Sequence, residues 1–485
     1  MALQKQKVKL TERGSIKNHV FHGLDKVKDI WNRMGDEVIV YFDPDVDGVV
    51  AGYLVCKFCA KHGKRFSWYI NSNRSHDWTI PTDSVSGKDI IAVDFIITAE
   101  KIGELVNAGC NIISMDHHKN GSKLIEFDNG IVINNQYPFE EEDCRYLSGT
   151  GVVFETLIQL DPEFDTLLNR QLVASALLSD IRDIENLLAE GYLYKLYSAK
   201  YDGFIRYLID ATLGEKDFGF GLPRMDRNFV DFKFSPAINA CLRFNQQDEV
   251  VNFILGGSKL NLYWRDQQKA LVRELSQAIN VIELNHLRVC YFYEKDFLKD
   301  ADVLSNFVGL SASQQLNNDK SVICYMIAYN GDVPYIKRAS FRGRINGLDY
   351  NKALSDLFLC LGHGSAFGIK GLIPNKSTFI KADKICGDVE DNSGYKRKII
   401  EVNNMSMFVG KNAYQIAEDN MYKLSQNQVV IRYKGKNIRR KRQGANYIEY
   451  EVDGIPVLCF DLKNTFEENL ITPVLDRGML TFYLE

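Results

Sequence analysis

The chain has 485 residues, of which 45% are hydrophobic and 25% are charged, and its formal net charge is −4. These proportions are typical of a globular protein and exclude a disordered or collagen-like chain. The length predicts two to four domains, and no apolar run approaches the roughly 20 residues that a membrane span requires, so no membrane partner is expected.

Residues 1–9 are polar and basic and lack the apolar segment of a signal peptide, which predicts a cytoplasmic protein. Cysteine usage agrees with a reducing compartment. Cys56 and Cys59 form the only close pair among ten cysteines, and no second pair completes a zinc site. We therefore expect two buried thiols on a helix.

The first half of the chain alternates short β-branched runs with helical patterns, which predicts βαβ units on a parallel sheet. Thr98 is suited to cap a helix and Gly109 to end it. The expected strands cover residues 37–42, 66–70, 89–93, 110–115 and 131–133, and the expected helices cover 48–62 and 98–108.

The second half begins with a mostly helical pattern over residues 149–213, and strand patterns return at 288–292 and 321–329. We interpret the spaced charges of 261–284 as a long connecting helix, and the alternating runs of the tail as a small β-rich module. The expected domains are residues 1–256, 257–284, 285–380 and 381–485. A basic cluster at 434–442 is typical of a solvated loop or of a strand edge.

Acidic and imidazole residues follow three of the predicted parallel strands. They are Asp43, Asp45 and Asp47 after the first strand, Asp94 after the third, and Asp116, His117 and His118 after the fourth. Ligands of open α/β sheets bind outside the carboxyl ends of the strands, so these side chains are expected to meet.

Carboxylates packed this closely repel one another unless cations lie among them. Carboxylate and imidazole ligands suit Mn²⁺ well, with Mg²⁺, Zn²⁺ and Co²⁺ as alternatives, and their number is enough for two ions. A metal pair activates water for phosphoryl displacement. Aspartate-rich strand ends also occur as turns and N-caps, but their recurrence after three strands favours a metal site.

These motifs resemble the first three motifs of the DHH phosphoesterases. Asp180, in the segment 177–181, is similar to the helical aspartate of the fourth motif, and Asp183 is the competing choice. The resemblance is closest to RecJ-type single-strand-specific exonucleases, because residues 235–243 are similar to the segment before their connecting helix. Residues 362–368 are similar to the glycine-histidine motif of the companion DHHA1 domain.

The resemblance implies an α/β protein with a parallel-sheet DHH domain, a connecting helix, a DHHA1-like α/β domain and a β-rich module, the place where RecJ enzymes often carry an OB-fold. By hypothesis Asp94 bridges two ions. The expected ligands of one ion are Asp43 and Asp45, and those of the other are Asp47, His117 and Asp180. We expect His118 to donate to the phosphate and Asp116 to orient an imidazole.

The DHHA1-like segment is expected to hold the substrate phosphate. The candidate residues are Asn239, Arg243, Arg342, Arg344, Gly362, His363, Gly364 and Ser365. For the two strand arginines 342 and 344, a role as ordinary surface charges stays open.

The function implied is that of a metal-dependent phosphodiesterase, a RecJ-like exonuclease that digests single-stranded DNA from 5′ to 3′. Its expected partners are single-stranded nucleic acid, DNA in preference to RNA, and a protein of the replication or repair machinery. One alternative is an oligoribonuclease or cyclic-dinucleotide phosphodiesterase of the same family. A second is a catalytically silent nucleic-acid-binding protein.

Overall fold

The computed structural model confirms the expected α/β class. It describes residues 19–70, 78–118, 121, 123–180, 207–208, 229–297, 299–316, 320–345, 348–370, 375–392, 398–408, 429–444, 447–459, 470–476 and 479–484. The chain divides into two compact units, residues 1–238, 248–260 and 397–485 in the first, and 239–247 and 261–396 in the second. Within the described ranges, no helix has the length and apolar character to cross a bilayer.

The first unit is built on a six-stranded sheet in the order β2-β1-β3-β4-β6-β5. All neighbouring strands are parallel except the short β5, which is antiparallel to β6. The strands are β1 (Glu37–Phe42), β2 (Arg65–Ile70), β3 (Asp89–Val93), β4 (Asn111–Asp116), β5 (Glu126–Phe127) and β6 (Gly130–Asn134). The parallel order brings the carboxyl ends of β1, β3 and β4 to one edge.

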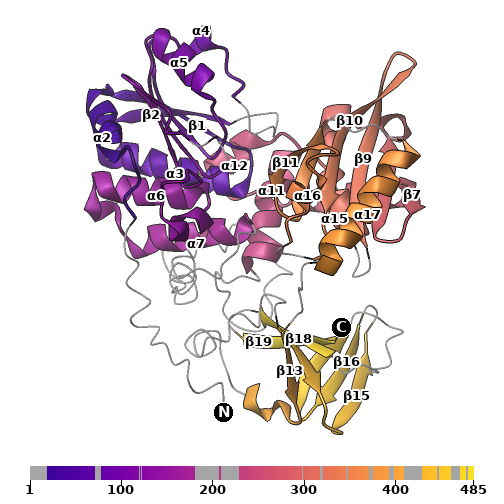
Figure 1. Cartoon of the computed structure of the whole chain (residues 1–485). Helices are drawn as coiled ribbons and strands as arrows, with labels where there is room; N and C mark the ends of the chain where they lie inside the picture. Colours follow the sequence, from indigo (N-terminus) through magenta and orange to yellow (C-terminus); the bar gives the residue numbers. More distant parts are fainter. Residues whose placement is uncertain are drawn as a thin grey trace. The chain divides into compact units, whose positions relative to one another are not determined.

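Helices cover both faces of this sheet (Figure 1). On one face, α5 packs on an apolar cluster that includes Tyr41, Ile90 and Ile112. The helices are α2 (Leu24–Arg33), α3 (Val46–Lys61), α4 (Thr82–Val85), α5 (Ala99–Asn107), α6 (Gly149–Leu160) and α7 (Leu167–Ser179). Thr98 caps α5, as predicted, by accepting a hydrogen bond from the backbone N of Lys101. Helix α3 buries the thiols of Cys56 and Cys59.

The first unit also contains the π-helical turn Val230–Phe234, the start of α11 (Ser235–Arg243), and α12 (Gln247–Ile254). The predicted helical region 149–213 is described as far as Asp180 and again at 207–208. The competing ligand Asp183 lies outside the described residues.

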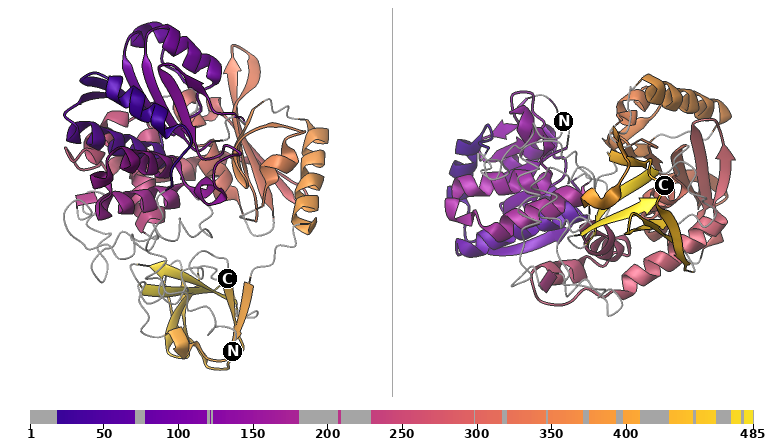
Figure 2. Two further views of the ribbon diagram at one scale, coloured as in Figure 1. Left: turned by 60° about the vertical axis from the view of Figure 1, so that its left-hand side comes forward. Right: turned by 90° about the horizontal axis from the view of Figure 1, so that it is seen from below.

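The second unit holds a sheet in the order β11-β12-β10-β9-β8-β7. Helices lie on both of its faces, with α13 and α15 packed on one and α16 and α17 on the other (Figure 2). The strands are β7 (Asn280–Glu283), β8 (Leu287–Tyr293), β9 (Ser321–Asn330), β10 (Val333–Arg342), β11 (Leu359–His363) and β12 (Ala366–Lys370). The helices are α13 (Tyr263–Ala278), α14 (Ala301–Ser305), α15 (Val308–Gln315), α16 (Tyr350–Leu354) and α17 (Lys376–Asn392).

Two predicted boundaries of this region differ from the structure. The connecting helix ends at Ala278, before the predicted residue 284, because Ile279 is extended and β7 then pairs antiparallel with β8. The tail is not β-rich from residue 381, because α17 continues to Asn392. Phe379, Ala382 and Cys386 recur at helical spacing and are buried against the second sheet.

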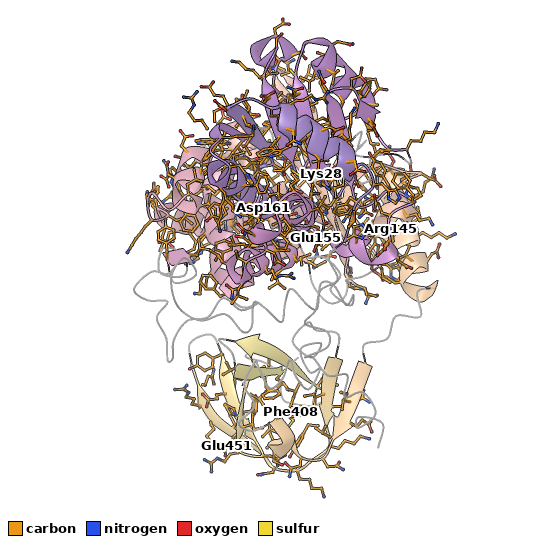
Figure 3. All side chains as sticks on the ribbon, turned by 90° about the vertical axis from the view of Figure 1, so that its left-hand side faces the viewer. Lys28, Arg145, Glu155, Asp161, Phe408 and Glu451 are labelled. Atoms are coloured by element: carbon orange, nitrogen blue, oxygen red, sulfur yellow. The ribbon has the colours of Figure 1, made fainter. Side chains whose placement is uncertain are left out.

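The C-terminal module is a seven-stranded sheet in the order β13-β14-β18-β19-β17-β16-β15. Its strands are β13 (Lys398–Val402), β14 (Val429–Tyr433), β15 (Ile438–Gln443), β16 (Ile448–Val452), β17 (Ile455–Cys459), β18 (Leu470–Asp476) and β19 (Met479–Leu484). Its core cluster draws only on residues between 400 and 484, and Phe408 lies among the strands (Figure 3). The basic cluster falls mainly on β15, an edge strand, as predicted.

Candidate metal centre

The turn between β1 and α3 carries three carboxylates. Asp45 caps α3, and its Oδ1 accepts a 3.0 Å hydrogen bond from the backbone N of Gly48. Asp43 and Asp47 are buried, with exposed fractions of 1% and 2%. A Cβ at Gly48 would lie 2.5 Å from the carbonyl O of Asp43, so glycine is needed for the helix to start this close to the strand end.

Asp47 is bound by the first residues of α6. Its Oδ1 accepts from Ser148 Oγ at 2.8 Å and from the backbone N of Thr150 at 3.0 Å. Its Oδ2 accepts from the backbone N of Gly149 at 2.7 Å. The first amides of a helix have no partner within the helix and carry partial positive charge, so they stabilise a carboxylate here. Both oxygens of Asp47 are thereby fixed in orientation.

Asp94 follows β3 in a left-handed backbone conformation, with φ 65°, which Asp and Asn adopt more readily than other non-glycine residues. Its side chain is buried. A Cβ at Gly149 would lie 2.3 Å from Asp94 Oδ1, so α6 approaches Asp94 as closely as it does Asp47. Burial and the charges of four neighbouring aspartates raise the pKa of Asp94 well above its usual value.

His117 lies between the carboxylates that follow different strands. Its Nε2 is 3.2 Å from Asp94 Oδ1 and 3.9 Å from Asp47 Oδ2, and its Nδ1 is 3.7 Å from Asp180 Oδ2. Asp180, the residue that ends α7, is thus brought to the same place as the strand-end residues.

His118 is held by Asp116, whose Oδ1 lies 2.7 Å from His118 Nδ1. Asn134, at the end of β6, donates to the carbonyl O of His118 at 2.8 Å and to Asp116 Oδ2 at 3.5 Å. Burial lowers the pKa of His118, but the charge and hydrogen bond of Asp116 outweigh burial and raise it to about 9. Asp116 therefore orients His118, the imidazole that the sequence analysis left unspecified.

The potential ligand atoms form three overlapping groups, and within each group the atoms lie within 4.8 Å of one another. The groups are Asp43, Asp45 and Asp94; Asp47, His117 and Asp180; and Asp94, His117 and His118. Asp94 Oδ1 is buried and receives no hydrogen bond of good geometry from the described residues. Oxygen and imidazole donors around a buried, crowded carboxylate fit Mn²⁺ or Mg²⁺.

The glycine-histidine segment of the second unit forms the turn between β11 and β12. Gly362 and Gly364 have φ values of 130° and 34°, and the carbonyl O of each accepts a hydrogen bond from Asn351. Ser365 accepts from the backbone N of Gly343 at 2.6 Å. The backbone of His363 ends β11, and its side chain lies outside the described part of the structure.

The two strand arginines differ in their surroundings. Arg342 pairs in register with Ala366, next to this turn, and binds the hydroxyls of Ser340 and Ser313. No carboxylate of the described residues lies within 4.0 Å of Arg342, and burial lowers its pKa to about 10. Arg344 instead pairs with Glu390 at 2.6 Å. Arg342 therefore has the environment of an anion-binding residue, and Arg344 that of a structural one.

Asn239 and Arg243 are not part of this turn. Both lie on α11, in the portion assigned to the second unit. The guanidinium of Arg243 donates to Gln268 of α13 at 2.7 Å, and its carbonyl accepts from Asn306. These contacts anchor α11 within the second unit.

Ser148, Thr150 and Asn134 were not predicted as site residues. Ser148 and Thr150 bind Asp47, and Asn134 binds Asp116 and the carbonyl of His118. A signal exists for the first two, because a Ser-Gly-Thr sequence at a helix start supplies several amide and hydroxyl donors.

The fold and this cluster define an α/β protein with a candidate metal-binding centre at the carboxyl edge of a parallel sheet. Comparison with known protein families and solved structures is more specific. Residues 37–179 match the DHH family, N-terminal domain, so this part of the chain is identified as a DHH domain.

Solved RecJ structures are similar in fold. RecJ from Thermus thermophilus in complex with Mn²⁺ is 16% identical and aligns over 96% of this chain and 71% of its own, with a TM-score of 0.66. Its complex with Mg²⁺ aligns with a TM-score of 0.56, 15% identity and shares of 96% and 70%. An exonuclease RecJ bound to manganese, 18% identical, aligns over 77% and 95% with a TM-score of 0.51. No curated protein sequence matches the chain.

Proposed function

We propose that the protein is a metal-dependent phosphodiesterase that digests single-stranded DNA, a cytoplasmic RecJ-like exonuclease. The observation that carries the proposal is the convergence of Asp45, Asp94, His117 and Asp180 from four elements on one buried centre. Carboxylates this close together repel one another, so some of them must be protonated unless cations bind among them. RecJ structures with Mn²⁺ and Mg²⁺ support both metals, and we expect Mn²⁺ to be preferred.

The position of each side chain indicates the role that it would have in hydrolysis. Asp43, Asp45 and Asp94 would hold one ion, and Asp47, His117 and Asp180 the other, with Asp94 shared. Two bound ions would supply a metal-activated water and offset the charge of the phosphate. His118 would donate to a phosphate oxygen, because Asp116 binds its Nδ1 and orients its ring. The α6 amides would keep Asp47 fixed throughout.

The substrate class follows from the second unit and the C-terminal module. Arg342, which has no acidic partner among the described residues, would bind a backbone phosphate beside the Gly362–Ser365 turn. The exposed edge strand β15 adds positive charge suited to a longer strand. Digestion from the 5′ end and contact with a replication or repair protein are expectations that rest on the resemblance to RecJ.

The second candidate is an enzyme of the same family that cleaves dinucleotides or cyclic dinucleotides, since the same metals serve both. A nuclease panel separates the two. We expect Mn²⁺ to support degradation of a 5′-labelled single-stranded DNA of about 30 nucleotides, EDTA to abolish it, and a dinucleotide to be cleaved more slowly. A preference for the dinucleotide would favour the second candidate function.

The D94N variant tests the metal centre itself, because it keeps the shape of the side chain but removes the carboxylate charge that would bind the ions. We expect turnover to fall by at least about a thousandfold. D83N, which changes an exposed aspartate of α4 in the same way, is the matched control and should keep full activity. Full activity of D94N would contradict the role of Asp94 in the metal centre. No metal-stimulated hydrolysis of any panel substrate by the wild type would instead favour a nucleic-acid-binding protein without catalysis.

A further inference from the structure

A second group of metal-binding side chains lies where the segment before α2 meets the turn before α6. His19, Glu140 and Cys144 each place one ligand atom within 4.8 Å of the others. They are 8%, 4% and 0% exposed, so the group is as buried as the metal centre described above. None of the three has a role in the proposed phosphodiester hydrolysis.

Glu140 is the centre of this group. Its Oε2 lies 3.1 Å from His19 Nε2, and its Oε1 lies 3.2 Å from His22 Nδ1. In a tetrahedral zinc site with bonds of about 2.0–2.1 Å to nitrogen and oxygen, neighbouring ligand atoms are about 3.3 Å apart. The two observed separations are close to this value, and each involves a different oxygen of the Glu140 carboxylate.

Cys144 supplies a soft ligand beside these harder ones. It lies in the 3₁₀ turn Glu142–Tyr146, and its Sγ donates to the carbonyl O of Glu141 at 3.0 Å. Burial raises the pKa of the Cys144 thiol to about 12, so the sulfur is protonated when no ion is bound. A zinc ion would replace this proton, with one H⁺ released to solvent for each thiolate bound.

We propose that His19, Glu140 and Cys144, with His22 as the fourth ligand, form a structural Zn²⁺ site. Imidazole nitrogen, carboxylate oxygen and thiolate sulfur, here from segments more than 100 residues apart, are all ligand types of zinc, and four of them complete a tetrahedron. The side chains of His19 and Glu140 are buried, whereas that of His22 is 58% exposed and would close the site from the solvent side. The backbone of the first segment is already fixed, because the N of His19 donates to Glu155 of α6 at 3.0 Å.

The ion would stabilise the turn of the chain that leads into the catalytic centre. Asn135 donates to the carbonyls of both Cys144 and Leu147. The next residue, Ser148, binds Asp47. A zinc ion on Cys144 would thus hold the turn that delivers the first residues of α6 to Asp47, without touching substrate.

The competing explanation is an ion pair between protonated His19 and Glu140, with Cys144 merely packed beside it. The two explanations differ in what happens to the sulfur, because an ion pair leaves the thiol protonated and a metal site requires thiolate. Cobalt(II) reports this directly: tetrahedral Co²⁺ bound to thiolate gives intense visible bands and a sulfur-to-cobalt charge-transfer band in the near ultraviolet. The Asp-His centre has no sulfur ligand and cannot produce the charge-transfer band.

The experiment is a Co²⁺ titration of the metal-free full-length protein, followed by displacement with Zn²⁺. We expect about one equivalent of Co²⁺ to develop the charge-transfer band, and Zn²⁺ to remove it. The band should be absent in C144S. In H19N, which keeps the thiol, the apparent affinity for Co²⁺ should fall at least tenfold. It should persist in D94N, whose catalytic centre is impaired, and in C290S, a buried thiol of β8 used as matched control.

Circular dichroism establishes that each variant is folded. If C144S fails to fold, H19N together with the wild-type titration still decides the question. The proposal is overturned if the wild type develops no thiolate band, or if the band persists unchanged in C144S or H19N. Loss of nuclease activity in D94N with the cobalt band retained would separate this site from the catalytic one.

Discussion

Single glycines decide how closely helices approach the metal centre. Gly48 allows α3 to start against Asp43, and Gly149 allows α6 to start against Asp94 and Asp47. At Gly149 the conflict would be with a carboxylate oxygen that is itself a predicted ligand. A methyl group there would displace either the ligand or the helix that fixes Asp47.

We therefore predict that G149A lowers Mn²⁺-dependent hydrolysis and metal affinity by about 10–100-fold, as is usual when the groups supporting a metal ligand are disturbed. Hydrolysis rates over a Mn²⁺ titration measure both. The matched control is G103A on α5, where the added Cβ meets only ordinary contact with the Phe127 ring at 3.4 Å. Equal activity of the two variants would contradict the predicted position of Asp94 in the centre.

Arg342 and Arg344 are two residues apart yet differ in their partners. Arg342 binds only hydroxyls and a backbone carbonyl, whereas Arg344 forms an ion pair with the buried Glu390. The guanidinium of Arg342 therefore keeps its charge for an anionic ligand, and that of Arg344 is already neutralised.

We predict that R342Q raises the KM for single-stranded DNA by about tenfold or more while its folding is preserved, because a charge-assisted phosphate contact is lost. R344Q should instead lower the midpoint of thermal unfolding, because it leaves the Glu390 carboxylate buried without its cation. Steady-state kinetics and thermal unfolding of both variants make the comparison. The reverse pattern would mean that Arg344 is the substrate ligand.

At the scale of elements, the end of α3 is tied to the turn after α6. Asp161 Oδ2 lies 2.5 Å from Lys61 Nζ and 3.1 Å from His62 Nε2 (Figure 3). Its Oδ1 accepts from the backbone N of Glu163 at 2.9 Å. The hydrogen bond from Lys61 is the largest of the effects that lower the pKa of Asp161 below its usual 3.8.

A lowered pKa means that the folded state favours the ionised carboxylate, so Asp161 stabilises the fold above about pH 4 and loses this contribution as the pH falls through its depressed pKa. We predict that D161N reduces the free energy of unfolding by about 1 kcal/mol at neutral pH, since the pair is partly exposed. Urea unfolding with EDTA, at neutral pH and at steps below pH 4, should show the difference from wild type shrinking. A difference independent of pH would contradict the ionic contribution.

The elements that sequence analysis predicted well are those with a strong burial pattern. The bounds of β1 and β3 agree with prediction because each is a continuous apolar run in the middle of a parallel sheet. β7 was missed because all four of its residues are exposed, so its sequence carries no alternation. The β-rich tail begins later than predicted, because the helical spacing of α17 continues past residue 381 to Asn392.

The candidate site could likewise be predicted only where its residues follow a strongly buried strand. Polar residues directly after buried parallel strands are recognisable in the sequence, and Asp43, Asp94 and His117, whose side chains belong to overlapping groups in the structure, were predicted in this way. The hydrogen bond from Ser148 to Asp47 joins residues 101 positions apart, and no local pattern reports such a contact. Local composition likewise could not reveal that Glu390 neutralises Arg344.

At the scale of the whole molecule, the C-terminal module presents its basic strand at an edge of its sheet. Lys441 and Arg442 are paired with Glu451 and Glu449, each at 2.6 Å. Arg439 and Arg440 are exposed and bear most of the unneutralised charge of β15. This strand would therefore contribute to the binding of a long strand and not to the cleavage of a short one.

We predict that R439E/R440E weakens binding of a 30-nucleotide single strand and lowers the slope of log Kd against log salt by roughly 1–2, because phosphate contacts are lost. Dinucleotide hydrolysis should not change. K26E/K28E on α2 reverses two charges elsewhere and should leave both properties as in the wild type. Equal weakening by the two double variants would indicate a general effect of net charge.

The left-handed backbone of Asp94 has a practical consequence for capturing a complex with intact nucleic acid. An inactive protein is needed for crystals of that complex, and alanine would add backbone strain on the order of 1 kcal/mol at this position. Asparagine tolerates the same torsion angles and nearly the same volume. The asparagine variant is thus the one to crystallise, because the end of β3 would retain its native path while the scissile bond survives.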